Sequence, residues 1–185
     1  SARWTASVET SGGPSGSDRW LKMLCTTADA SPGAAEQQFI RQGVESSNCA
    51  SLVDTSTGKI GAVTVSGQLI AHSTTSFPLK VALLFWPEDG TSRQYVSDIS
   101  VTADATWQAF SVTIPADTVA IFDNNNGLGL RVGLSLCAGS NLQASDNTWA
   151  NQTNDSVTSA THNWAAATNE YIGFTNFKVE RGSVA

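Results

Sequence analysis

The chain has 185 residues and a mass of 19.4 kDa, which suits one domain whose single core needs no disulfide or metal support. Its net charge of −6 and pI near 4.7 argue against nucleic-acid binding, because a protein that neutralises phosphates needs an excess of positive charge. The longest apolar run, 81–86, is far shorter than the roughly 20 residues of a membrane-crossing helix, so we expect no membrane insertion. Only 14% of the residues are charged and 43 are serine or threonine, which predicts a neutral, hydroxyl-rich surface.

Apolar and polar residues alternate with a period of two, which predicts about eight β-strands. In chain order they cover 19–26, 38–44, 60–71, 77–86, 93–101, 110–114, 127–137 and 171–180. The run 77–86 has one strongly apolar face. Pro115 ends the predicted strand 110–114, because proline cannot donate a backbone hydrogen bond to a neighbouring strand. In the last strand the apolar phase changes, which predicts a β-bulge near Thr175-Asn176.

Helical alternatives exist only at 31–38 and 161–168; both would be short, and the first develops no amphipathic stripe. The strands therefore predict an all-β chain, a two-sheet antiparallel β-sandwich or jelly roll, with 1–185 as a single domain. The sequence lacks an initiator methionine, so we expect a processed chain or a piece of a longer protein. One long surface loop, 138–168, remains between strands, and loops of that length are usually functional or disordered.

Three cysteines, Cys25, Cys49 and Cys137, form no C-x-x-C pair and are odd in number. We therefore expect no disulfide framework, and a reducing compartment. Because Cys25 and Cys137 lie in apolar runs, we interpret them as buried hydrophobic residues.

No common catalytic, metal or phosphate-binding signature occurs, so we predict no catalytic residues, no cofactor and no metal. His72 fits the end of a strand, and His162 fits a loop surface. Glu88-Asp89 is the nearest candidate for the carboxylate pair of a glycosidase, although its flanking proline and glycine favour a solvated turn. The stretch 123–127 offers oxygen ligands for a structural calcium, but it lacks EF-hand spacing, and a turn is favoured.

Six tryptophans are unusual beside only two tyrosines. Trp20, Trp86 and Trp107 lie in or near predicted strands, and we expect at least two of them to be buried. Trp149 and Trp164 lie in the long loop among amides, where an indole could stack on a sugar ring while amides bind its hydroxyls. The predicted glycan-binding residues are Trp149, Trp164, Asn147, Asn151 and Gln152. In the alternative, the two tryptophans fix the loop onto the sandwich.

The order of several segments resembles a jelly-roll module of bacteriophage tail-fibre and minor virion structural proteins. The matching segments are 17–20 (SDRW), 37–45 (QQFIRQGVE), 57–67 (TGKIGAVTVSG), 106–115 (TWQAFSVTIP), 126–130 (NGLGL) and 177–185 (FKVERGSVA). That family usually ends on Gln-Leu-Glu-x-Gly, of which this chain keeps only Glu180 and Gly182.

The resemblance implies a non-enzymatic virion part, assembled in the bacterial cytoplasm with other fibre, tail or capsid proteins. It implies a homotrimer that often contacts the host surface, so a host glycan is an expected partner. The alternative is the carbohydrate-binding module of a secreted carbohydrate-active enzyme. A third possibility, a free-standing hydrolase, would need a cleft that gathers two acidic side chains.

Overall fold

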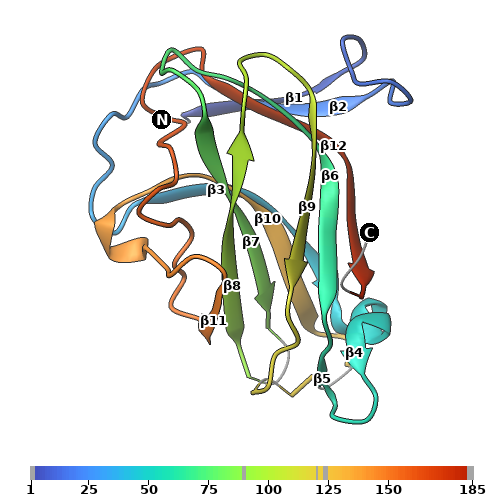
Figure 1. The fold of residues 1–185 in the computed structure, drawn as a ribbon. Helices are drawn as coiled ribbons and strands as arrows, with labels where there is room; N and C mark the ends of the chain where they lie inside the picture. The colour runs from blue at the N-terminus through green and yellow to red at the C-terminus, as the bar shows by residue number, and fades with distance from the viewer. Residues whose placement is uncertain (1–2, 89–90, 120, 123–124, 183–185) are drawn as a thin grey trace.

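The computed structural model describes residues 3–88, 91–119, 121–122 and 125–182. Two five-stranded antiparallel sheets pack face to face (Figure 1), which confirms the predicted β-sandwich. Sheet A has the order β1-β2-β12-β6-β9, with bounds Trp4–Glu9, Trp20–Cys25, Tyr171–Arg181, Val63–His72 and Gln108–Ile114. Sheet B has the order β11-β8-β7-β10-β3, with bounds Thr148–Asn151, Arg93–Val101, Leu79–Pro87, Leu128–Ala138 and Gln37–Glu45.

Each of the eight predicted strands corresponds to one strand of the two sheets. Four further strands were not predicted: β1, β11, and the small hairpin formed by β4 (Val53–Asp54) and β5 (Lys59–Ile60). Two 3-10 helices, η1 (Ser46–Leu52) and η2 (Ser140–Leu142), lie outside the two helical alternatives. No helix forms at 31–38 or 161–168. The long loop is therefore partly regular, since it contains η2 and β11.

The main core lies between the sheets, where alternate residues of facing strands point inward. On β10, Leu130, Val132, Leu134 and Leu136 are all buried in this core, whereas Leu128 at the start of the strand is only partly buried. Such alternation buries one side of each strand and leaves the other to solvent or to a covering segment.

Strand β7 is instead buried on both faces. Its outward residues Ala82, Leu84 and Trp86 form a second apolar cluster with Val96 of β8. Phe39 of β3 packs edge-on against Trp86, with ring centroids 5.9 Å apart. Together Trp86 and the buried Trp20 confirm the prediction that at least two of the three strand tryptophans are buried. The outward face of sheet B is thus partly covered, which gives the 138–168 segment a surface to pack on.

The predicted bulge in β12 is confirmed. The pairing of β12 with β6 shifts register between Thr175 and Lys178, and Asn176 has a positive φ of 53°. The extra residue lets both Phe174 and Phe177 pack against the core although they are three positions apart. The phase change in the sequence therefore reflects a real change in which side chains of the strand face the core.

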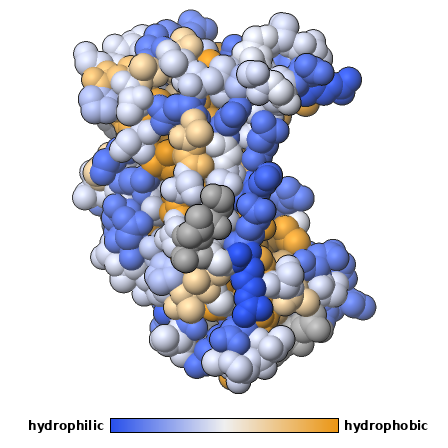
Figure 2. All heavy atoms as spheres, turned by 45° about the vertical axis from the view of Figure 1, so that its right-hand side comes forward, coloured by the Kyte–Doolittle hydropathy of each residue, from blue (hydrophilic) through white to orange (hydrophobic). Residues whose placement is uncertain are grey.

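The surface is mainly hydrophilic or of intermediate hydropathy, and apolar residues form small separate patches on the face shown in Figure 2. Cys25 and Cys137 are buried free thiols, as predicted, and so is Cys49. Among the described residues, no helix has the length and apolarity to cross a membrane.

Candidate functional site

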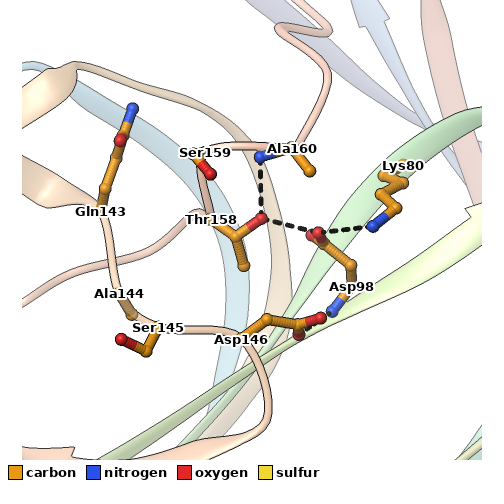
Figure 3. A pocket seen from close by; sticks show the side chains of 9 residues that line it. All are labelled: Lys80, Asp98, Gln143, Ala144, Ser145, Asp146, Thr158, Ser159 and Ala160. Atoms are coloured by element: carbon orange, nitrogen blue, oxygen red, sulfur yellow. Dashed lines mark hydrogen bonds and ion pairs between the residues drawn. The ribbon is translucent and has the colours of Figure 1, made fainter.

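A polar pocket of about 390 Å³ lies on the outward face of sheet B, over β7 and β8 (Figure 3). Its floor comes from these strands, and its walls come from 143–146 and 158–160 of the long segment. The volume is near the lower end of the range typical of small-molecule sites. The lining residues are Lys80, Asp98, Gln143, Ala144, Ser145, Asp146, Thr158, Ser159 and Ala160.

Strand register places Lys80 and Asp98 together on the floor. Lys80 pairs with Ser100 and Ala82 pairs with Asp98, so the two charged residues lie on neighbouring strands and face outward. Lys80 Nζ lies 3.4 Å from Asp98 Oδ2. The Lys80 side chain is 40% exposed and that of Asp98 only 2%, so the ammonium reaches solvent while the carboxylate does not.

Asp98 fastens both walls of the pocket to the sheet. Thr158 Oγ1 donates to Asp98 Oδ2 at 2.6 Å, and Thr161 Oγ1 donates to Oδ1 at 2.8 Å. The backbone N–H of Asp98 donates to Asp146 Oδ1 at 3.0 Å in the opposite wall. Hydrogen bonds to a charged group are each worth about 1.5–3 kcal/mol, so this network holds the pocket open in one shape.

Several polar groups of the walls have unused hydrogen-bonding capacity. Within the described part of the chain, the side chains of Gln143, Ser145 and Ser159 make no hydrogen bond, and all three are exposed. Asp146 Oδ2 is likewise without a partner there, because only its Oδ1 is used. The pocket therefore offers an amide, two hydroxyls, a carboxylate oxygen and the Lys80 ammonium to a ligand.

Trp164 corrects the predicted glycan site. Its side chain is 0% exposed and belongs to the main core, so it cannot stack on a sugar at the surface. Its indole Nε1 donates to the Lys80 carbonyl at 3.1 Å, and its backbone N–H donates to the Leu136 carbonyl at 2.9 Å. Both N–H groups of Trp164 are thus satisfied by neighbouring strands, which lets the large ring enter the core.

Trp149 is half-buried and also serves packing. It pairs with Tyr95 on β8, and its ring lies edge-on to those of Tyr95 and Phe85 at 5.3 and 6.1 Å. Its Nε1 donates to the Pro115 carbonyl at 2.8 Å, across the sandwich. These contacts match the alternative expectation, in which the tryptophans fix the long segment onto the sheets.

The three predicted amide residues, Asn147, Asn151 and Gln152, do not form one site. Asn151 Oδ1 accepts from Arg93 at 2.7 Å, and Gln152 donates to Glu88 at 2.9 Å, so both stabilise the end of β11. Asn147 follows the pocket residue Asp146 directly, and its Oδ1 accepts from Ser97 at 2.7 Å. Of the five predicted residues, only Asn147 adjoins the pocket.

Sequence reasoning missed the pocket itself. The outward phase of Lys80 and Asp98 could have been read from strand alternation, but nothing in the sequence indicates that residues 158–161 fold back onto Asp98. The hydroxyls of Thr158 and Thr161 resemble those of any other polar loop until this return is known.

The pocket gathers two acidic side chains, Asp98 and Asp146, as a hydrolase would require. Glycoside hydrolysis needs both carboxyl groups to face the sugar. Asp98 is shielded from solvent, and both of its oxygens accept hydrogen bonds from threonines. Only one carboxylate therefore faces the pocket. Of the candidate pair Glu88-Asp89, Glu88 contacts Arg131 and Gln152, and Asp89 lies outside the described residues.

Both histidines lie next to carboxylates, and neither lines the pocket. The prediction of a loop surface for His162 is wrong, because its side chain is only 13% exposed. His72 ends β6, as predicted, with its Nδ1 2.8 Å from Asp104 Oδ1. His162 Nε2 lies 3.3 Å from Ser73 Oγ and 3.4 Å from Glu170 Oε2, and Ser73 donates to Glu170 Oε1 at 2.5 Å. A catalytic triad needs the carboxylate on the other imidazole nitrogen, so this cluster is not one.

Across the described residues, no group of three or more histidine, cysteine or acidic side chains could hold a metal ion. Residues 123 and 124 of the calcium alternative lie outside the described part of the chain. Burial raises the pKa of the Cys137 thiol to about 12 and also raises that of Cys25, so neither offers a reactive thiolate near neutral pH.

No family model matches the sequence, and no curated protein matches it either. Two solved structures are similar in fold. The first, described as "CBM4 structure and function", is 15% identical with a TM-score of 0.39 and covers 95% of this chain and 77% of its own. The second, described as "Structural analysis of an exo-beta-agarase", is 11% identical with a TM-score of 0.48 and covers 98% of this chain and 23% of its own. At these identities the likeness concerns the β-sandwich fold alone.

Proposed function

We propose that the protein is a non-catalytic carbohydrate-binding module whose sugar site is the pocket over β7 and β8. The observation that carries this proposal is the set of unused polar groups on the pocket walls, from Gln143, Ser145, Asp146 and Ser159. A sugar presents many hydroxyls in fixed directions, and each can both donate and accept a hydrogen bond. The amide, hydroxyl and carboxylate groups of the lining match that chemistry.

The charges of the pocket favour a neutral sugar. Asp98 and Asp146 carry two negative charges against the one positive charge of Lys80, and the whole chain has a net charge of −6. An acidic sugar would be repelled by both the pocket and the overall field. The lining holds no aromatic side chain, so hydrogen bonds rather than ring stacking would provide the affinity.

The test is isothermal titration calorimetry with a panel of neutral monosaccharides and disaccharides. The decisive variant is Asp146→Asn, which keeps an oxygen to accept the Asp98 N–H and removes the charge that strengthens a sugar hydrogen bond. We expect affinity to fall about tenfold or more, with an unchanged thermal midpoint. Asp18→Asn is the matched control, since Asp18 is exposed and distant in sequence from the pocket lining. Equal sugar affinity of both variants would show that the pocket is not the sugar site.

A virion location is a second proposal, supported by the order of the segments that resemble phage tail-fibre modules. In that setting the pocket would bind a host-surface glycan, and the domain would be displayed by fibre, tail or capsid proteins. The sequence of the complete gene separates this from the module of a carbohydrate-active enzyme. A neighbouring glycosidase domain would overturn the virion proposal and leave the sugar site intact.

A further inference from the structure

Strand β3 lies next to β10 (Figure 1) and is the outermost strand of sheet B. Part of it is exposed to solvent. Its first half is covered, since Trp4 of β1 donates to the Gln38 side chain. In its second half, Arg41, Gln42, Gly43 and Glu45 are exposed. Among the described residues, no strand pairs with the outer edge of this half. A free edge with unpaired backbone groups is a template for another strand.

The exposed half carries two opposite charges at equal distances from Gly43. Arg41 and Glu45 lie two positions on either side of it, and all three side-chain positions alternate onto the same outward face. Neither charge is neutralised by an ion pair within the described residues. Arg41 lies over the rings of Phe39 and Trp86, and Glu45 Oε2 accepts a hydrogen bond from Asn48 at 3.5 Å.

We propose that two copies of the chain associate through antiparallel pairing of β3 with β3, about a two-fold axis at Gly43. In this register Arg41 of each copy lies opposite Glu45 of the other, and Gln42 lies opposite Val44. Opposed side chains in an antiparallel pair have Cβ atoms about 4.5–5.5 Å apart, which long charged side chains span. The pairing uses the five residues 41–45 and extends sheet B across both copies.

The surroundings of Arg41 support a carboxylate partner. Burial, and after it the charge of Arg131, lower the pKa of Arg41, and the charge of Glu88 offsets them only in part. A carboxylate from a second copy would offset the remainder. A C2 contact is self-complementary, and two oppositely charged residues spaced evenly about its axis meet that condition.

Other free edges fit a second copy less well. Strand β9, at the edge of sheet A, carries no charged residue, and β1 carries only Glu9. The pocket over β7 and β8 stays open in the proposed dimer, because β3 is at the opposite edge of sheet B from β8 and β11. The dimer would therefore present two pockets. It is a two-fold assembly and not the trimer that the family resemblance implies.

The test combines charge reversal with analytical ultracentrifugation. Glu45→Arg places like charges opposite each other twice, and we expect dimer affinity to fall about tenfold or more. Adding Arg41→Glu restores both pairs with inverted signs, so the double variant should recover the wild-type affinity. Glu180→Arg, an exposed residue of β12, controls for the change in net charge. A monomer at all concentrations, a trimer, or a dimer indifferent to these changes would overturn the proposal.

A cysteine placed on the axis tests the register directly, and it does not depend on the charges. Gly43→Cys should form an intermolecular disulfide on mild oxidation, because facing residues have Cα atoms about 4.5–5.5 Å apart. The new Cβ would meet Leu128 Cδ1 at 3.0 Å, which a small movement of that side chain relieves. Gln42→Cys is the control, since its twin lies two residues further along the partner strand, beyond disulfide reach. Equal cross-linking of both variants would refute the register.

Discussion

Replacing Trp164 should cost stability without changing sugar affinity. The side chain is fully buried in the main core, and truncation of a buried tryptophan to alanine costs about 3–5 kcal/mol. For a chain of this size each kcal/mol lowers the thermal midpoint by roughly 2–4 °C, so Trp164→Ala should melt about 10 °C lower. That loss is a large part of the roughly 5–15 kcal/mol that stabilises a typical domain.

A second substitution separates the hydrogen bond from the packing. Trp164→Phe removes the indole N–H that bonds the Lys80 carbonyl, yet that carbonyl still accepts the backbone N–H of His162 at 3.0 Å. No buried acceptor is left unsatisfied, so we expect the lost hydrogen bond to cost only about 1 kcal/mol, with a further contribution from the smaller ring.

The assay is urea unfolding followed by far-ultraviolet circular dichroism, with sugar titrations of each folded variant. Equal slopes of the free energy against urea would show that the variants unfold to the same extent. A Trp164→Ala protein that kept its unfolding free energy within 1 kcal/mol of wild type while losing sugar binding would refute this reasoning. It would place the indole at the surface, as the loop composition suggested.

Three further substitutions test the packing of the sandwich. Burial raises the pKa of Cys137 to about 12, so as pH rises the thiol ionises in the unfolded chain before it does in the folded one. The free energy of unfolding should therefore fall as pH rises from about 9 to 12. Cys137→Ala should lessen that fall, as measured by thermal melting at a series of pH values. Gly133→Ala should cost about 1–3 kcal/mol by urea unfolding, since its Cβ would collide with the Ile40 carbonyl oxygen. Asp117→Ala should cost about 3–5 kcal/mol, because Arg93, bound to it at 3.0 Å, would lose its buried partner.

Each of these has a clear contrary result. An unchanged alkaline fall in the Cys137→Ala protein would assign the effect to tyrosines or lysines instead. A Gly133→Ala protein as stable as wild type would mean that β3 is not packed closely against β10. If Asp117→Ala cost less than 1 kcal/mol, the ion pair with Arg93 would be open to water.

Strand alternation was sufficient to predict the sandwich because inward and outward residues differ strongly in polarity. The bulge near Thr175 was predictable for the same reason, since a change of phase has few other causes. Strand β11 was missed because its four residues, Thr148–Asn151, are too short for alternation to show and lie among amides typical of loops. Such a strand forms because β8 offers a free edge in the folded sheet, and that edge leaves no pattern in the sequence of 148–151.

The candidate site was predicted less well, and the reason lies in burial. Asn and Thr around Trp164 indicated an exposed loop, but the local backbone hydrogen-bonds to Leu136 and Lys80 and carries the indole into the core. The pocket depends on Asp98, whose role needs the partners Thr158 and Thr161 some 60 positions away. Contacts between such distant residues leave no periodic pattern in one sequence.

The most direct test of the proposed sugar site is a titration of the isotope-labelled protein with neutral sugars, followed by amide resonances in nuclear magnetic resonance spectra. We expect the saturable changes in amide chemical shift to concentrate in 143–146 and 158–160, with neighbouring changes on β7 and β8 around Lys80 and Asp98. Shifts centred on another surface, or no saturable shift with any sugar of the panel, would contradict it.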